Sequence, residues 1–397
     1  MLLWPLNLKT NLKKLLKRED DFLKKIGIIT INDYKNYGNR LQNYASQEVL
    51  KSLGYSPETI VNIQKEKINV ESSNIIGTKL KKLTLRKVVG KIYKKFKYNY
   101  FYDKKNKKCN EQKEENFRVF TNKYIKESNY SISEGSYHEE LNGFDCFVVG
   151  SDQVWNPNYR SGSSIDFLTF APIQKRVSYA ASFGISSIPD KYSREYTEWL
   201  SNFSALSVRE EAGANIIKKL TGRDTDVLVD PTLMLTKQQW LKISSPPLNK
   251  PKGQYILTYF LGEKNKNTKK YLKRLRYKYN FDIYNMADIS DSESYINSPS
   301  EFIDLINDAN LVITDSFHGC VFSVIFEKPF IVFERNSGQN NSMNSRIETL
   351  LSKFNLSSRM VENVKDEHIL KIDYADVKAT LENEKQKALI FLKKALP

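Results

Sequence analysis

Short apolar runs alternate with stretches of helical periodicity along most of the chain. The first run, residues 26–31, predicts a buried strand, and a polar loop over 32–39 leads into a helix over about 40–53, which Gly54 ends. Further strands are predicted at Cys146–Val149, 176–180, 205–208 and 227–229. Strands that alternate with helices indicate parallel sheets joined by right-handed crossovers.

The same rhythm restarts after a proline-rich stretch around Pro246, Pro247 and Pro251. This stretch predicts a boundary between two domains, residues 1–244 and 254–397. Strands then follow at 255–261, Asp282–Met286, Leu311–Thr314 and 329–333, with helices at about 268–278, Pro299–Asp308 and 320–326. The predicted fold class is α/β, and a length of 397 residues fits two domains of roughly 100 to 200 residues each.

The net charge of +16 is concentrated in two segments. Residues 79–108 contain 13 basic residues and one acidic residue, and residues 9–25 contain seven basic and three acidic ones. The rest of the chain holds 42 residues of each sign, so it has no basic excess to neutralise phosphates. Nucleic acid is therefore not an expected partner.

Simple counts exclude other classes of protein. No apolar run approaches the roughly 18 to 20 residues of a transmembrane helix, and the apolar residues 1–8 precede the lysines, which reverses the order of a secretory signal. The three cysteines are widely spaced, and the three histidines form no zinc pattern. A cytoplasmic protein without disulfides, structural metal or cofactor is expected.

Part of the basic segment has the periodicity of an amphipathic helix. Its apolar positions are Leu85, Val88, Val89, Ile92, Phe96 and Tyr100. Its lysines are Lys87, Lys91, Lys94, Lys95 and Lys97. One interpretation is a helix that packs on the first domain with a solvated lysine face, a second is attachment to an anionic membrane surface, and a third is contact with nucleic acid.

Open parallel sheets bind ligands beyond the carboxyl ends of their strands, so the residues after strands are candidate site residues. His318 follows the strand Leu311–Thr314 at the start of an apolar helix, where backbone N–H groups and the helix dipole favour an anion. There it holds an anion, acts as a general acid or only hydrogen-bonds the loop. Asp315 either orients His318 or caps the helix.

Loops of the first half supply further candidates. Arg209 suits bidentate recognition of a carboxylate or phosphate, unless it pairs with Glu210 or Glu211. Asp152 is a candidate general base, and Gly150 before it allows a close backbone approach to a ligand.

Two more positions have alternative interpretations. Trp155 either stacks on a sugar ring or anchors the packing of its loop. Gly38 and Asn39 end the first loop and are suited to hold a phosphate, although Gly38 alternatively serves only to supply a positive φ angle.

Six short motifs follow one another in a fixed order. They are GNRLQNYA at 38–45, GSDQVWNP at 150–157, SYAASFG at 178–184, SVRE at 207–210, DPT at 230–232 and TDSFHG at 314–319. Together they resemble the motifs of the polysaccharide pyruvyl transferase family, over about residues 26–356. The resemblance implies two Rossmann-like domains that face a cleft, similar to GT-B glycosyltransferases.

Family members of known activity transfer the pyruvyl group of phosphoenolpyruvate to a sugar as a ketal and release phosphate. The resemblance implies that His318 and Arg209 bind the two anionic groups of phosphoenolpyruvate, with Asp152 as candidate base. The other implied substrate-binding residues are Gly38, Asn39, Ser151, Gln153, Trp155, Asp315, Ser316 and Gly319. Several members carry Arg-x-His at the last motif, whereas this chain has Ser316 in place of that arginine.

Acceptors in polysaccharide synthesis are commonly lipid-linked at the cytoplasmic leaflet. With such an acceptor, the membrane interpretation of the basic segment 79–108 implies peripheral attachment at the inner face of the cell membrane, and packing on the first domain stays the alternative. Two alternatives are a glycosyltransferase that uses a nucleotide-sugar and a catalytically silent protein of a membrane-bound glycan assembly.

Overall fold

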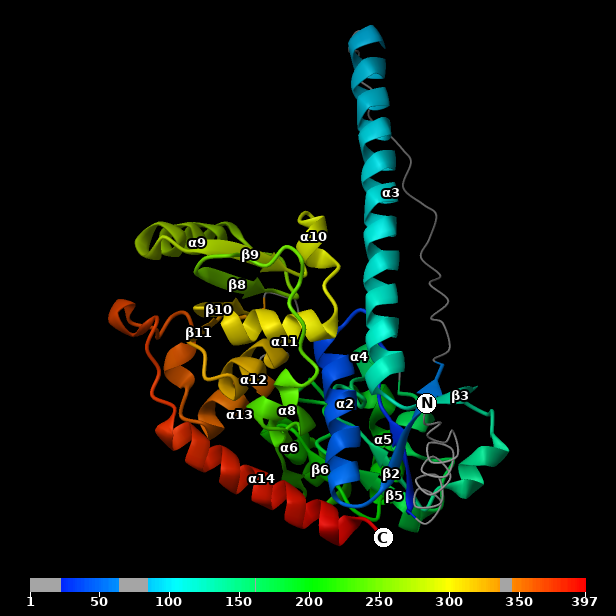
Figure 1. Cartoon of the computed structure of the whole chain (residues 1–397). Helices are drawn as coiled ribbons and strands as arrows, with labels where there is room; N and C mark the ends of the chain where they lie inside the picture. Colours follow the sequence, from blue (N-terminus) through cyan, green and yellow to red (C-terminus); the bar gives the residue numbers. More distant parts are fainter. Residues whose placement is uncertain (1–22, 64–84, 161, 336–344) are drawn as a thin grey trace, which may run out of the picture.

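The computed structural model describes the backbone of residues 23–63, 85–160, 162–335 and 345–397. It describes the side chains of all these residues except 85–104. The chain forms two α/β units, and the paired strands of both main sheets run parallel (Figure 1). The predicted fold class is confirmed, because this parallel pairing is what the alternation of strands and helices indicated.

The first unit contains a sheet of order β3-β2-β1-β4-β5. Its strands are β1 (Lys25–Ile29), β2 (Ser56–Asn62), β3 (Glu127–Ile132), β4 (Cys146–Val149) and β5 (Arg176–Ser178). A short parallel pair, β6 (Ser207–Val208) and β7 (Asp226–Val227), continues it through a bridge from Val177 to Ala205. The helices are α2 (Tyr37–Ser52), α3 (Leu85–Tyr124), α4 (Pro157–Arg160), α5 (Asp190–Ser201), α6 (Glu211–Thr221), α7 (Pro231–Met234) and α8 (Lys237–Leu241).

The second unit contains a sheet of order β11-β10-β8-β9. Its strands are β8 (Tyr255–Tyr259), β9 (Asp282–Met286), β10 (Leu311–Thr314) and β11 (Phe330–Val332). Its helices are α9 (Lys266–Tyr279), α10 (Ser292–Tyr295), α11 (Pro299–Asp308), α12 (Phe317–Ile325), α13 (Ser345–Lys353) and α14 (Ala375–Ala395). Every strand predicted in this half is present; β8, β10 and β11 are fully buried apolar runs, and β9 is an edge strand with polar positions.

An aromatic cluster joins the two units. The ring of Tyr37 on α2 stacks on Phe302 of α11 at 5.0 Å and packs edge-on against Tyr259 of β8. The Tyr37 hydroxyl donates to the backbone oxygen of Asn297 at 2.8 Å. Tight packing of this kind holds the carboxyl ends of the two sheets toward each other.

The C-terminal helix α14 returns to the first unit. It contacts α7, and the hydroxyl of Tyr55 donates to the backbone oxygen of Pro397 at 2.8 Å (Figure 1). The predicted second domain, 254–397, therefore ends against the first unit.

The predicted basic helix forms the N-terminal part of α3. Figure 1 shows this part extending away from both units, whereas the C-terminal part of α3 lies beside α2. Residues 79–84 and the side chains of 85–104, which carry the predicted apolar and lysine faces, lie outside the described set. Over the part of the chain that the structure describes, no helix combines the length and apolar character needed to cross a membrane.

Candidate active site

A cavity of about 420 Å³ lies between the two units. It opens where the loops after β1, β4, β8 and β10 meet, which is the edge where parallel sheets bind ligands. The first unit contributes Ile31, Asp33, Asn36, Asn39, Asp152, Gln153, Tyr159 and Arg160. The second unit contributes Leu261, Ser316, Phe317, His318, Arg335 and Arg346.

His318 belongs to the second unit, and its side chain lies against residues of the first unit. It lies in the first turn of α12 and is 6% exposed, and its Nε2 is 3.7 Å from the carboxylate of Asp230 without a hydrogen-bond partner. Its Nδ1 lies against Gly38, where a Cβ atom would come within 2.0 Å. The interpretation that Gly38 supplies a positive φ is wrong, because α2 begins at Tyr37 and Gly38 is helical. Gly38 makes room for the imidazole.

Both interpretations of Asp315 are wrong. Its carboxylate accepts hydrogen bonds from the backbone N–H groups of Leu261 and Gly262, at 2.7 and 2.8 Å, and so ties the loop after β8 to that after β10. The cap of α12 is Ser316, whose hydroxyl accepts from the backbone of Gly319. A serine is a favourable N-cap, which accounts for this residue at the position where several family members carry arginine.

Asp230 is the centre of a buried network behind His318. Its carboxylate accepts from Arg209 at 2.5 Å and from the hydroxyl of Ser151 at 2.8 Å, and Thr232 satisfies the other oxygen. Burial alone would raise the pKa of Asp230, but His318 and Arg209 hold it well below its usual range. Asp230 is therefore an ionised carboxylate that lies directly behind the imidazole of His318.

Arg209 does not line the cavity. It is 4% exposed, pairs with Asp230 and stacks over Phe317 at 4.3 Å, so the expected alternative partners, Glu210 and Glu211, are not the ones it takes. Glu210 instead accepts from the backbone N–H groups of Phe183 and Gly184.

Asp152 faces the cavity with its carboxylate held on both sides. The Asn39 amide donates to it at 3.2 Å, the backbone of Gln153 donates at 2.8 Å, and Arg209 lies 3.7 Å away. Burial opposes its ionisation, but the charges of Arg209 and His318 lower the pKa of Asp152 below its ordinary value. The group is therefore ionised at neutral pH and a weak proton acceptor in this state of the site.

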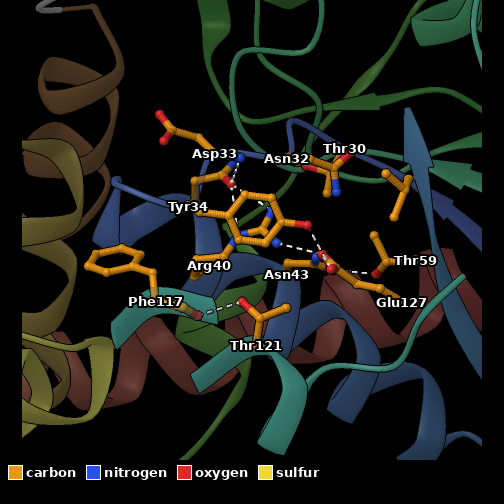
Figure 2. Close-up of polar contacts among 12 residues, drawn as sticks. Thr30, Asn32, Asp33, Tyr34, Arg40, Asn43, Thr59, Phe117, Thr121 and Glu127 are labelled. Atoms are coloured by element: carbon orange, nitrogen blue, oxygen red, sulfur yellow. Dashed lines mark hydrogen bonds and ion pairs between the residues drawn. The ribbon is translucent and has the colours of Figure 1, made fainter. Parts of the chain in front are cut away.

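A polar network fixes the loop after β1 and the first turn of α2, which carries Asn39. Arg40 donates to Ile31 O and Asn39, and it pairs at 2.7 Å with Glu127 of β3. Figure 2 shows Arg40 and the hydroxyl of Tyr34 meeting at Glu127. The loop after β1 is thus tied to the edge of its own sheet.

Besides Arg160, which pairs with Asp166, two arginines of the cavity were not predicted from the sequence. Arg346 of α13 is 6% exposed, and its Nε has no hydrogen-bond partner among the described residues. Burial, followed by the charge of Arg209, lowers the pKa of Arg346 to about 10. Arg335 donates to the backbone oxygen of Asp315 at 3.1 Å. No motif marks either arginine, because both reach the cavity only through the packing of the second unit.

Three expected substrate-binding residues are buried away from the cavity. Trp155 is fully buried, stacks on Phe167 and donates to the backbone oxygen of Asp166, so it is the packing anchor and not a sugar platform. Ser151 supports Asp230. Gly319 packs against Thr314, whose side chain would be 2.3 Å from an added Cβ.

Solved structures with the same broad architecture are distant. UDP-GlcNAc 2-epimerase from Neisseria meningitidis is 10% identical with a TM-score of 0.45, over 94% of this chain and all of that chain. MurG from Acinetobacter baumannii is 8% identical with a TM-score of 0.39, over 94% and 96% of the two chains. SnogD from Streptomyces nogalater is 11% identical with a TM-score of 0.38, over 94% and 97%. A search of curated proteins gives no significant match.

The parallel sheets and the cavity between them define a two-domain α/β protein of GT-B-like form whose site presents cations and a buried histidine. The sequence model described as polysaccharide pyruvyl transferase matches residues 36–337. The chain belongs to this family, as the six motifs suggested, and membership implies a transferase that acts on a polysaccharide.

Proposed function

We propose that the protein transfers the pyruvyl group of phosphoenolpyruvate to a sugar as a ketal and releases phosphate. The observation that carries the proposal is the meeting of His318, Arg335 and Arg346 in one cavity of a chain that belongs to this family. A carboxylate and a phosphate need cations that are not already neutralised, and the unpartnered Nε of Arg346 is available for that purpose.

Arg346 compensates for Ser316. A serine at this position removes one cation from the loop after β10, but Arg346 brings one to the same cavity from α13, beside Arg335, which pairs with Asp315 at 3.5 Å. Family membership and this replacement support a donor that is a small dianion.

The chemistry requires one acid and acceptors for two protons. Protonation of the methylene carbon of phosphoenolpyruvate creates a cationic centre at C2, to which a sugar hydroxyl adds as it loses its proton. A second hydroxyl then displaces phosphate, loses its proton and closes the ketal. We assign proton donation to His318, whose Nε2 has no hydrogen-bond partner among the described residues and which lines the cavity. Asp152 is the candidate acceptor, because it lines the cavity and the negative charge of a donor bound there would raise its pKa.

We further propose a lipid-linked acceptor and peripheral attachment at the inner face of the cell membrane. The basic segment 79–108 supports this location, since part of it forms the end of α3 that extends away from both units.

Phosphate release from phosphoenolpyruvate tests the proposal. Purified protein with membrane extract as acceptor source should release phosphate, and mass spectrometry should find the mass of a pyruvyl ketal on the glycan. Consumption of a nucleotide-sugar instead would favour a glycosyltransferase. Neither reaction, together with intact glycan binding, would indicate the catalytically silent alternative.

A further inference from the structure

A second cavity, of about 740 Å³, lies on the second unit between α9 and β9. Figure 1 shows these two elements side by side at the upper edge of that unit. The charged residues that line this second cavity are Lys264, Lys269, Lys273, Arg276, Asp282 and Asp288. We call this cavity the basic groove.

The charges of the groove are not balanced. Lys264 is neutralised by Asp288 at 2.8 Å, and this contact lowers the pKa of Asp288 to about 2 against the effect of its burial. Lys269, Lys273 and Arg276 are exposed, and the described residues place no carboxylate within ion-pair distance of any of them. Three cations therefore remain for a ligand.

The opposite face of α9 shows the contrast. Arg274 and Lys278 both pair with Asp366, at 3.1 and 3.0 Å. The helix has seven basic residues and no acidic one between Lys266 and Tyr279, so the fold provides a partner for one face and leaves the groove face unpaired. Exposed lysines need no partner to be stable, but three on one concave face create a positive potential.

The spacing of the three cations suits a chain of anions. Positions 269, 273 and 276 follow one another at intervals of four and three residues, which places neighbouring side chains about 5 to 6 Å apart along the helix. Asn285 and Ser290 add polar groups, and Tyr277, which is 75% exposed, adds an aromatic ring. Polar groups and an aromatic ring around a concave surface suit a sugar chain better than a flat membrane surface.

The groove and the cavity that holds His318 are lined by residues of the same loop. Leu261 lines that cavity and Lys264 lines the groove, and both belong to the loop after β8. Three residues span at most roughly 11 Å, so a chain whose end reacts in the first cavity reaches the second within a short distance.

We propose that the basic groove binds a stretch of the acceptor glycan that carries carboxylate or phosphate groups. This assignment rests on the proposed function, because it makes the groove an acceptor subsite. It names the acceptor as an anionic polysaccharide, held by Lys269, Lys273 and Arg276 while its reacting sugar lies beside His318.

Calorimetric titration with defined oligosaccharides tests the assignment. The probes are a hexamer of galacturonic acid, a phosphorylated oligosaccharide of similar length and a neutral maltohexaose. We expect at least one anionic probe to bind at least tenfold more tightly than the neutral one, with affinity that falls as salt is added. The tighter anionic probe identifies the charged group. Equal binding of the neutral probe would overturn the assignment.

Two triple variants locate the binding. Lys269→Gln, Lys273→Gln and Arg276→Gln together should weaken binding of the anionic hexamer about tenfold. The matched control changes the same number of charges at exposed positions elsewhere, Lys219→Gln, Lys393→Gln and Lys394→Gln, and should leave binding within twofold. Thermal unfolding verifies that both variants fold. If the two variants bind the hexamer with equal affinity, the basic groove is not its binding site.

Two further outcomes also decide the matter. Competition between phosphoenolpyruvate and the hexamer would place the hexamer in the first cavity and overturn the assignment. Loss of sedimentation with anionic vesicles in the groove variant, with hexamer binding unchanged, would assign the surface to a membrane instead. Because these assays need no turnover, their result stands apart from phosphate release by the wild-type protein, which tests the proposed function.

Discussion

The imidazole of His318 occupies the space that a side chain at position 38 would need. An added Cβ would lie 2.0 Å from Nδ1, so Gly38→Ala must move a residue of the other unit. We expect turnover to fall at least tenfold with little change in thermal stability, because α2 itself tolerates alanine. Gly143→Ala is the matched control, since its Cβ meets nothing within 4 Å. Equal activity of the two variants would show that the position of His318 is not critical.

Removal of the imidazole tests the assigned proton donor. We expect His318→Ala to lower the rate of phosphate release by on the order of 10² to 10⁴, the usual range for loss of a general acid. Circular dichroism and thermal unfolding should show a folded protein. Near-normal turnover in the folded variant would remove His318 from the mechanism.

The buried charge of Arg346 lowers the stability of the fold and is kept available for the ligand. An unpaired buried cation destabilises the fold, as the lowering of its pKa to about 10 indicates, so Arg346→Met should raise the free energy of unfolding by about 1 to 4 kcal/mol without ligand. The rise in Tm that phosphoenolpyruvate causes in the wild-type protein should disappear. Differential scanning calorimetry with and without phosphoenolpyruvate measures both effects.

The control for this variant is another buried arginine. Arg359 donates to the backbone oxygens of Phe330, His368 and Ile369, so Arg359→Met should destabilise the protein and leave the ligand effect intact. If Arg346→Met destabilises in the same way, Arg346 is a structural residue.

Sequence reasoning finds a site residue when a strand end brings it to the cavity. His318, Asp152 and Asn39 follow buried strands or begin the next helix, and all three line the cavity. Arg346 and Arg335 could not be found in this way, because they arrive from a helix and a loop whose placement depends on tertiary packing. Trp155 was assigned to the substrate although its loop turns it into the core.

At the scale of elements, α3 carries the prediction on membrane attachment. Lysines near an anionic surface contribute up to about 1 kcal/mol each, so changing Lys87, Lys91, Lys94, Lys95 and Lys97 to Gln should abolish sedimentation with anionic vesicles. Binding of the wild-type protein should weaken as salt is added, since exposed charges are screened beyond roughly 8 to 10 Å at physiological ionic strength. Turnover on a soluble acceptor analogue should be retained. Unchanged sedimentation would show that these lysines do not attach the protein to a membrane.

The elements that sequence reasoning missed have weak patterns. β2 reads SPETIVN and β3 reads ESNYSI, and both mix polar with apolar positions because β3 is an edge strand and β2 is only partly covered. The crossover between them, α3, is 40 residues long and mostly polar, and only its N-terminal part, residues 85–100, was predicted as a helix. The strands at the centre of each sheet, by contrast, are continuous apolar runs and were recognised without difficulty.

For the whole molecule, the pair of Asp230 and His318 couples acidity to stability across the two units. The pKa of Asp230 in the folded protein lies below its unfolded value of about 3.9, so its contribution is complete above that pH and is lost as the pH falls toward the folded pKa. Asp152 acts in the same direction. The free energy of unfolding, measured in urea between pH 3 and 7, should therefore fall steeply at the acidic end of this range; we call this fall the acid limb.

Asp230→Asn should flatten this limb. At pH 7 the variant should be less stable by about 3 to 5 kcal/mol, because a buried arginine loses its partner. The difference from the wild-type protein should shrink below pH 4. Parallel curves at all pH values would show that Asp230 does not control the acid limb.

The return of α14 to the first unit restricts how the two halves can move. The chain passes from the first unit to the second over residues 242–254 and comes back through α14, whose last residue is bound by Tyr55. The two units are therefore joined at three places: this linker, α14 and the packing of Tyr37 on Phe302. Three contacts that do not lie on one line fix the orientation of one unit on the other, and so they fix the place of His318 against Gly38.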